Sequence, residues 1–135
     1  MNSIIENSRS DWNKLLDENN IKYEDLKKIL NSEEFRRQAG EVINKKNDFY
    51  FKDKSNIHGS GIFAKKHISK DDIIGVVSSS GSEKYRTYLG RFTNHSNINN
   101  IVFKELKPGK VFAISTKDIK SGEEILVNYR DHLFK

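Results

Sequence analysis

The triplet Asn94-His95-Ser96 brings together side chains well suited to contact a polar ligand. Asn and His side chains both donate and accept hydrogen bonds, so a tight segment of them can recognise an amino-acid head group or a purine. The triplet is entered through Arg91 and Phe92 and leads into an apolar run at 101–103. Taken alone, such a triplet is more often a solvated loop. The triplet also matches a glycosylation sequon, but we do not interpret it as one because no secretion signal is visible.

A second segment, GSGIFA at residues 59–64, formally matches a dinucleotide-binding fingerprint. That fingerprint needs a strand before it and a helix after it, whereas Ile62 and Phe63 are expected to continue as a strand. We interpret Gly59 and Gly61 as a tight turn whose missing side chains let a ligand approach the backbone, with an ordinary hairpin turn as the alternative.

The third segment is GEEILVNY at residues 122–129. A turn begins a strand whose alternation places Ile125, Val127 and Tyr129 on one face. A tyrosine at the end of a strand is most often a core residue with its hydroxyl at the surface, so this segment says little by itself.

Composition excludes several kinds of chemistry. The chain has no cysteine, which excludes disulfides and thiol catalysis. No metal site is expected, because the histidines show no ligand spacing; they are His58, His67, His95 and His132. No apolar run is long enough to span a bilayer and no secretory signal is visible, so we expect a cytoplasmic protein without a membrane partner.

Residues 1–48 are expected to form a helical extension, because apolar residues recur at helical spacing. Ser8 or Ser10 would cap the first helix and Asn31 or Ser32 would begin the third. Three stripes define the faces: Ile5, Trp12, Leu15 and Leu16 with Asn19; Tyr23, Leu26, Ile29 and Leu30; and Phe35, Ala39, Val42 and Ile43. These stripes predict packing faces rather than cofactor sites, and Gly40 interrupts the third.

Residues 49–135 are expected to form a β-rich domain. Short runs of aromatic and β-branched residues alternate with turn residues: FYF, GIFA, DIIGVV, NIVF, KVFAI and EILVNY. Pro108-Gly109 suits a tight turn closing a hairpin. The predicted fold class is therefore mainly β with a helical N-terminus, of the α+β type.

The charge is divided unevenly between these two parts. The net charge is −1 over residues 1–48 and +6 over residues 49–135. A basic field favours acidic or nucleic-acid-associated partners, although a solvated lysine-rich surface explains it as well.

Taken in order, HGSGIFA, RFTNHS and GEEILVNY resemble the SET domain, a family of protein-lysine methyltransferases that use S-adenosylmethionine. The resemblance covers about residues 49–135 and is closest to minimal viral and bacterial members without zinc-binding flanking modules. It implies several short curled sheets. It also implies that the segment at 91–96 is threaded beneath the loop leading to the last strand, in a pseudoknot-like crossing.

The resemblance also implies roles for individual residues. The turn that contains Gly59, Ser60, Gly61, Ile62 and Phe63 would lie against the methionine portion of the cofactor. Within a cofactor-binding segment that starts at Arg91 and Phe92, Asn94 would bind the same portion and His95 would contact the adenine through its main chain. Phe134 would cover the adenine or the lysine channel.

Tyr129 is the catalytic tyrosine that the resemblance implies. Methyl transfer from a sulfonium to a lysine amine is an in-line displacement that needs a positioned, uncharged amine, whereas free lysine has a pKa of about 10.4. The Tyr129 hydroxyl would orient the amine. Tyr85, Tyr88 and Val127 would line the substrate channel with it.

The expected partner is a protein or peptide that carries the target lysine. Since the region at 77–91 is short, substrate recognition would fall to the N-terminal helices or to the second subunit of a homodimer. The basic charge favours an acidic or nucleic-acid-associated target over a histone tail. Two alternatives stay open: a SET-fold module that binds cofactor or peptide without turnover, and a basic nucleic-acid-binding β-protein.

Overall fold

The computed structural model describes residues 3–132. Within these described residues there are four helices and a short 3-10 helix: α1 (Ser3–Glu18), α2 (Tyr23–Leu30), α3 (Glu33–Ala39), α4 (Tyr88–Phe92) and η1 (Tyr129–Asp131). The strands are β1 (Glu41–Ile43), β2 (Tyr50–Lys54), β3 (Ser60–Ala64), β4 (Ile73–Ser80), β5 (Lys84–Thr87), β6 (Asn94–His95), β7 (Ile101–Lys107), β8 (Lys110–Ser115) and β9 (Glu124–Val127). The predicted α+β class is confirmed.

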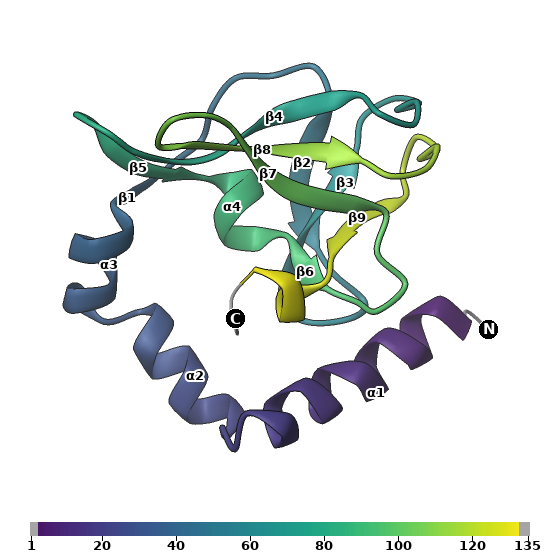
Figure 1. Cartoon of the computed structure of the whole chain (residues 1–135). Helices are drawn as coiled ribbons and strands as arrows, with labels where there is room; N and C mark the ends of the chain where they lie inside the picture. The colour runs from purple at the N-terminus through teal and green to yellow at the C-terminus, as the bar shows by residue number, and fades with distance from the viewer. Residues whose placement is uncertain (1–2, 133–135) are drawn as a thin grey trace.

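The strands form two sheets. One has the order β1-β5-β4-β8-β7 and the other the order β2-β3-β9-β6. Apolar side chains from both sheets and from α4 form the main core, in which Ile62, Leu89, Ile101 and Ile125 are fully buried. Figure 1 shows α1 and α2 running beneath this β-rich part, with α3 leading up to β1.

The hairpin between β7 and β8 forms as predicted at Pro108-Gly109. Gly109 has a φ of 77°, a left-handed conformation that glycine adopts without strain. Tight turns of this kind explain why the strand runs could be recognised from the sequence.

The first helix begins earlier than its predicted caps. Ser8 and Ser10 lie inside α1, which starts at Ser3, so the prediction that either of them caps this helix is wrong. Ser8 is instead fully buried and its Oγ lies 2.7 Å from Ser96 Oγ. Its polar side chain therefore joins α1 to the β-rich part.

The third helix is shorter than predicted. Ser32 caps α3, as expected, by accepting a hydrogen bond from the Phe35 N–H at 3.1 Å. The predicted extension through Val42 and Ile43 is wrong, because the chain turns at Gly40, with a φ of 88°, and both residues enter β1. That strand pairs in parallel with β5, so the five-stranded sheet includes residues from the predicted N-terminal extension.

The N-terminal helices have a second apolar cluster of their own. Trp12, Leu15, Leu16 and Leu26 pack against Ile57 and Leu126 of the β-rich part. In the described part of the chain, no helix is long and apolar enough to cross a membrane.

Candidate functional site

The polar segment that opens with Thr93 is a buried crossing. Residues 93–96 are all buried, and β6 pairs in parallel with β9. The Ser96 N–H donates to the Val127 carbonyl at 3.0 Å, and the Tyr129 hydroxyl donates to the Thr93 carbonyl at 2.6 Å. Since these bonds join two segments far apart in sequence, the crossing is fixed rather than slack.

Asn100 holds the same crossing from its far side. Its Nδ2 donates to the Glu124 carbonyl at 2.9 Å, and its Oδ1 accepts from the Leu126 N–H at 2.7 Å. One amide side chain thereby replaces a strand in pairing with β9. Such a bond pair needs Asn in this register, which the asparagine-rich sequence of the loop provides.

Asn94 has its amide nitrogen fully committed within the protein. Its Nδ2 lies 2.9 Å from the His58 carbonyl, 3.0 Å from the Ser60 carbonyl and 3.0 Å from Glu124 Oε2. All three partners are acceptors, so the orientation of the amide is unambiguous. The side chain therefore offers Oδ1, an acceptor, to any ligand beside it.

Glu124 contributes a half-buried carboxyl that contacts the amide of Asn94. Burial raises the pKa of this carboxyl, while the hydrogen bonds from Asn94 and Ser55 oppose the rise. A Cβ on Gly61 would overlap Glu124 Oε2, so the carboxyl would have to move if another residue stood there. The second glycine of the turn thus makes room for this carboxylate.

The ring of His95 links Tyr129 to the N-terminal helix. Its Nδ1 accepts from the Tyr129 N–H at 2.9 Å, so Nε2 carries the proton and lies 2.6 Å from Asp11 Oδ2. Burial lowers the pKa of His95, although Asp11 raises it in part. The neutral imidazole acts as a positioning group in the protein interior.

Arg130 closes this network at the surface. Its Nη1 lies 2.7 Å from Asp11 Oδ2 and its Nε lies 2.9 Å from Glu18 Oε2. The hydrogen bond from Arg130 is the main reason that the pKa of Asp11 is lowered. The residue directly after Tyr129 therefore anchors α1.

Tyr129 projects its hydroxyl into the interior at the start of η1. The group donates to the Thr93 carbonyl, and burial raises the pKa of the phenol well above its usual value. The hydroxyl thus stays protonated at any physiological pH. Its oxygen keeps lone pairs with which to accept a hydrogen bond from a ligand.

A cavity of about 260 Å³ lies between the motif residues and the N-terminal helices. On the motif side it is lined by Gly59, Ser60, Arg91, Phe92, Asn94 and Tyr129. On the helical side it is lined by Trp12, Tyr23, Leu26, Lys27, Leu30 and Asn31. Residues from all three sequence motifs thus meet at one cavity.

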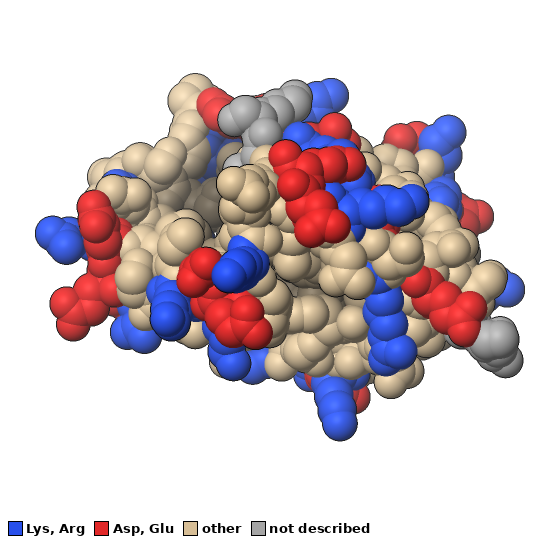
Figure 2. Space-filling view, turned by 90° about the horizontal axis from the view of Figure 1, so that it is seen from below, with Lys and Arg blue, Asp and Glu red and all other residues tan. Residues whose placement is uncertain are grey.

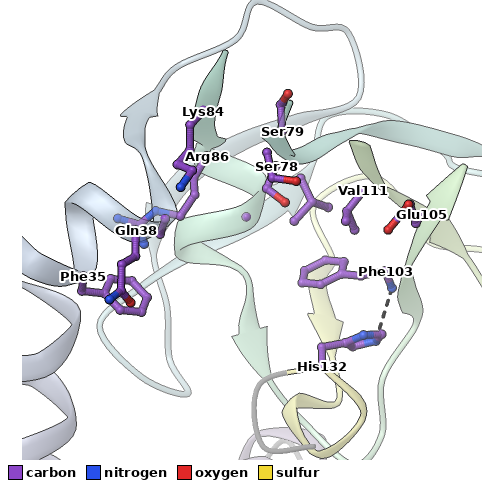
Figure 3. Close-up of a pocket in the computed structure, with 14 residues that line it drawn as sticks. Phe35, Gln38, Ser78, Ser79, Lys84, Arg86, Phe103, Glu105, Val111 and His132 are labelled. Carbon is purple, nitrogen blue, oxygen red and sulfur yellow. Dashed lines mark hydrogen bonds between the residues drawn. The ribbon is translucent and has the colours of Figure 1, made fainter. Parts of the chain in front are cut away.

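A second, larger cavity of about 490 Å³ adjoins the first. Figure 3 shows it between Phe35 of α3 and Phe103 of β7, with Arg86 and Lys84 at its upper left and His132 below. Phe35, Arg86, Gly90 and Phe103 line both cavities, so the two meet at an aromatic and basic junction. A long side chain entering the larger cavity can point toward the smaller one.

The junction is electropositive. Arg86 is only 9% exposed, its guanidinium lies 4.9 Å from the Phe35 ring, and its Nε has no partner among the described residues. Burial, with Arg91 and Arg36 nearby, lowers the pKa of Arg86. Elsewhere charges are mixed: Figure 2 shows acidic and basic side chains interspersed over the face seen from below.

The structure brings together about half of the predicted site residues. Gly59, Ser60, Arg91, Phe92, Asn94 and Tyr129 line the smaller cavity. The other predicted residues are absent from the linings of both cavities, and their roles stay predictions: Gly61, Ile62, Phe63, His95, Val127, Tyr85 and Tyr88. Phe134 lies outside the described residues.

Several predicted residues that line neither cavity make other contacts within the protein. Ile62 and Val127 are fully buried in the main core, and Phe63 stacks on Phe51 with centroids 5.8 Å apart. Lys45 Nζ lies over the Tyr85 ring at 5.3 Å, and Tyr88 packs edge-on against Phe92. Nothing in these contacts directs the two tyrosines toward a cavity.

Four residues that line the smaller cavity were not among the predicted site residues: Trp12, Phe35, Arg86 and Phe103. Trp12 and Phe35 were assigned to helix packing faces because they fit apolar stripes. A signal was available for Trp12, since the only tryptophan of the chain is a large amphipathic side chain with a donor that needs a partner. No cluster of His, Asp or Glu among the described residues could hold a metal.

A family model and solved structures are similar to parts of this chain. Residues 75–130 match the SET domain family model. No curated protein matches the chain. A Plasmodium falciparum protein provisionally assigned as a histone methyltransferase is 23% identical with a TM-score of 0.49, over 67% of this chain and 100% of that one.

An autoinhibited ctPRC2 structure bound to S-adenosylmethionine has the same fold in part. It is 22% identical with a TM-score of 0.51, over 64% of this chain and 16% of that one. The matched segment at 75–130 runs from β4 through the crossing to Arg130. Residues 75–130 are therefore similar to a SET domain, and the described fold is like that of this SET-containing structure.

Proposed function

We propose that the protein is an S-adenosylmethionine-dependent protein-lysine N-methyltransferase. The observation that carries the proposal is that all three motifs meet at the smaller cavity, with Tyr129 in its lining and the larger cavity adjoining it. This layout lets a cofactor and a lysine side chain approach one point from two sides.

The smaller cavity has unpaired hydrogen-bond donors, which suit a cofactor with many hydrogen-bond acceptors. Trp12 Nε1 and Arg86 Nε are buried, line this cavity and have no partner among the described residues. Buried donors are almost always paired, so they call for acceptors such as a carboxylate, ribose oxygens or purine nitrogens. Arg91 suits the carboxylate of the methionine portion, and Asn94 Oδ1 suits its ammonium.

S-adenosylmethionine, when bound, supplies an electrophilic methyl group on a sulfonium. The protein must deliver the lysine amine uncharged and aligned with that methyl. Phe35 and Phe103 flank the way from the larger cavity and disfavour the ammonium by desolvation, aided by Arg86 and Arg91. The ammonium proton passes to bulk water before the side chain enters.

Tyr129 orients the amine rather than deprotonating it. Its proton is donated to the Thr93 carbonyl and its raised pKa keeps the phenol neutral, so it cannot act as a base. The phenol oxygen accepts an amine N–H and thereby aims the nitrogen lone pair. His95 fixes the backbone of Tyr129 through the bond to its N–H.

We propose a protein segment as the substrate, lying in the larger cavity. Its lining carries Lys84 and Arg86 opposite Glu105, so it suits a segment with charges of both signs around the target lysine. The expected homodimer and the expected nucleic-acid-associated target find no support in this geometry or in the comparisons.

The test is transfer of labelled methyl from S-adenosylmethionine to proteins of a cell lysate, comparing wild type with Tyr129→Phe. We expect labelling by wild type and a loss of about a hundredfold or more in the variant, by analogy with other pre-organised hydroxyls. Calorimetric affinity for S-adenosylhomocysteine serves as the control and should be little changed. Wild-type binding without transfer would favour a binding module, and absence of binding would contradict the proposal.

A further inference from the structure

The smaller cavity has a wall that lies outside the SET-matched segment. Trp12 of α1 and Tyr23, Leu26, Lys27 and Leu30 of α2 line it, whereas the family match begins at residue 75. The N-terminal helices therefore do more than pack against the domain. They form one side of the site itself.

Trp12 is the residue of this wall that most clearly lacks a partner. It is 7% exposed, and its indole N–H has no acceptor among the described residues. Its ring stacks on His58 with centroids 4.9 Å apart and an interplanar angle of 28°. It also meets Tyr129 edge-on at 5.3 Å. A buried donor of this kind at a cavity indicates a ligand that provides the acceptor.

The position of Trp12 is set by neighbouring residues of α1. Ser8 lies one turn before it and bonds Ser96, and Asp11 lies next to it and bonds both His95 and Arg130. These bonds fix α1 on either side of the indole. The orphaned N–H therefore belongs to a side chain held in place, and rotation of α1 cannot supply the missing acceptor without breaking them.

We propose that Trp12 is a cofactor-binding residue of this site, with its indole N–H donating to an acceptor of the nucleoside part of S-adenosylmethionine. This inference rests on the proposed function. Arg91 and Asn94 offer their groups to the charged amino-acid part. Because the Trp12 ring is packed against His58 and Tyr129, the group that it offers to a ligand is its indole N–H. The N-terminal helices thus complete the cofactor site of the SET domain.

The single tryptophan gives a direct readout. Wild-type protein is titrated with S-adenosylhomocysteine, and tryptophan fluorescence is followed beside calorimetry. We expect a saturable change in emission with the calorimetric dissociation constant. Trp12→Phe, which keeps an aromatic ring but removes the donor, should weaken calorimetric binding roughly threefold to tenfold, as loss of one neutral hydrogen bond implies.

Ser10→Ala is the matched control. Ser10 is an exposed residue of α1 outside the cavity lining, so this change should leave affinity within about twofold. If wild type binds by calorimetry while its emission stays unchanged and Trp12→Phe binds equally, this inference fails alone. If wild type does not bind at all, the proposed function fails with it.

Discussion

Asn94 has a structural role that does not depend on a ligand. Its amide nitrogen satisfies the carbonyls of His58 and Ser60 and the carboxylate of Glu124. It thereby ties the glycine turn to the crossing. The turn and the crossing are 34 residues apart, so this one side chain sets the distance between two walls of the cavity.

Asn94→Asp tests this role with a side chain of nearly equal shape. The change replaces the donor by a carboxylate facing Glu124 and two carbonyls, so like charges oppose each other and the carbonyls of His58 and Ser60 lose this donor. We expect the free energy of unfolding to fall by about 3 kcal/mol or more, measured by urea denaturation. Asn97→Asp, at an exposed position of the same loop, should change it by less than about 0.5 kcal/mol. Equal effects would contradict the role.

The sequence identified the motif residues but not the partners of their side chains. Gly59, Asn94 and Tyr129 could be assigned to one site because each belongs to a motif with its own residue types and order. The contact between His95 and Asp11 joins positions 84 apart, and no local pattern marks Asp11 as anything but a solvated helix residue. Contacts between distant elements are set by tertiary packing, which periodicity does not encode.

At the scale of elements, the junction of α3 and β1 decides how the N-terminal part meets the sheet. Apolar spacing continued across Gly40, so the helix was predicted to run on through Val42 and Ile43. The glycine ends it because the chain turns there with positive φ. The backbone of Lys84 also approaches so closely that a Cβ on Gly40 would lie 2.5 Å from its carbonyl oxygen.

Gly40→Ala should therefore displace β1 from β5. Strain from the positive φ adds to the clash with backbone, so we expect a loss of about 2 kcal/mol or more in the free energy of unfolding, read from thermal melting. Gly81→Ala is the control, because a Cβ there meets nothing within 4 Å. A variant at position 40 as stable as the one at 81 would show that β1 pairing contributes little.

At the scale of the whole molecule, burial of neutral histidine makes stability depend on pH. The pKa of His95 and that of His58 are both lowered, chiefly by burial. The unfolded chain then binds more protons than the folded one below about pH 6.5, so stability falls as pH falls through that range. Asp11, whose pKa is also lowered, adds the same slope at lower pH, whereas Glu124, with a raised pKa, opposes it.

We expect the free energy of unfolding to decrease between pH 7 and pH 5, measured by urea denaturation at several pH values. Protonation of His95 would also break its bond from the Tyr129 N–H. His95→Gln cannot ionise, so its curve should be flatter than that of wild type, and His58→Gln gives the matched comparison. Parallel curves for wild type and His95→Gln would assign the pH dependence to other groups.

The bonds that join α1 to Arg130 can form only late in synthesis of the chain. Asp11 leaves the ribosome long before Arg130, which lies 119 residues later. At translation rates of about 5 to 20 residues per second, its partner follows roughly 6 to 24 seconds afterwards. During that interval the apolar face of α1 lacks Leu126, although Leu26 and Ile57 of the same cluster have already been synthesised. A nascent chain of this protein is therefore a candidate for chaperone protection at its first helix until its last segment has emerged.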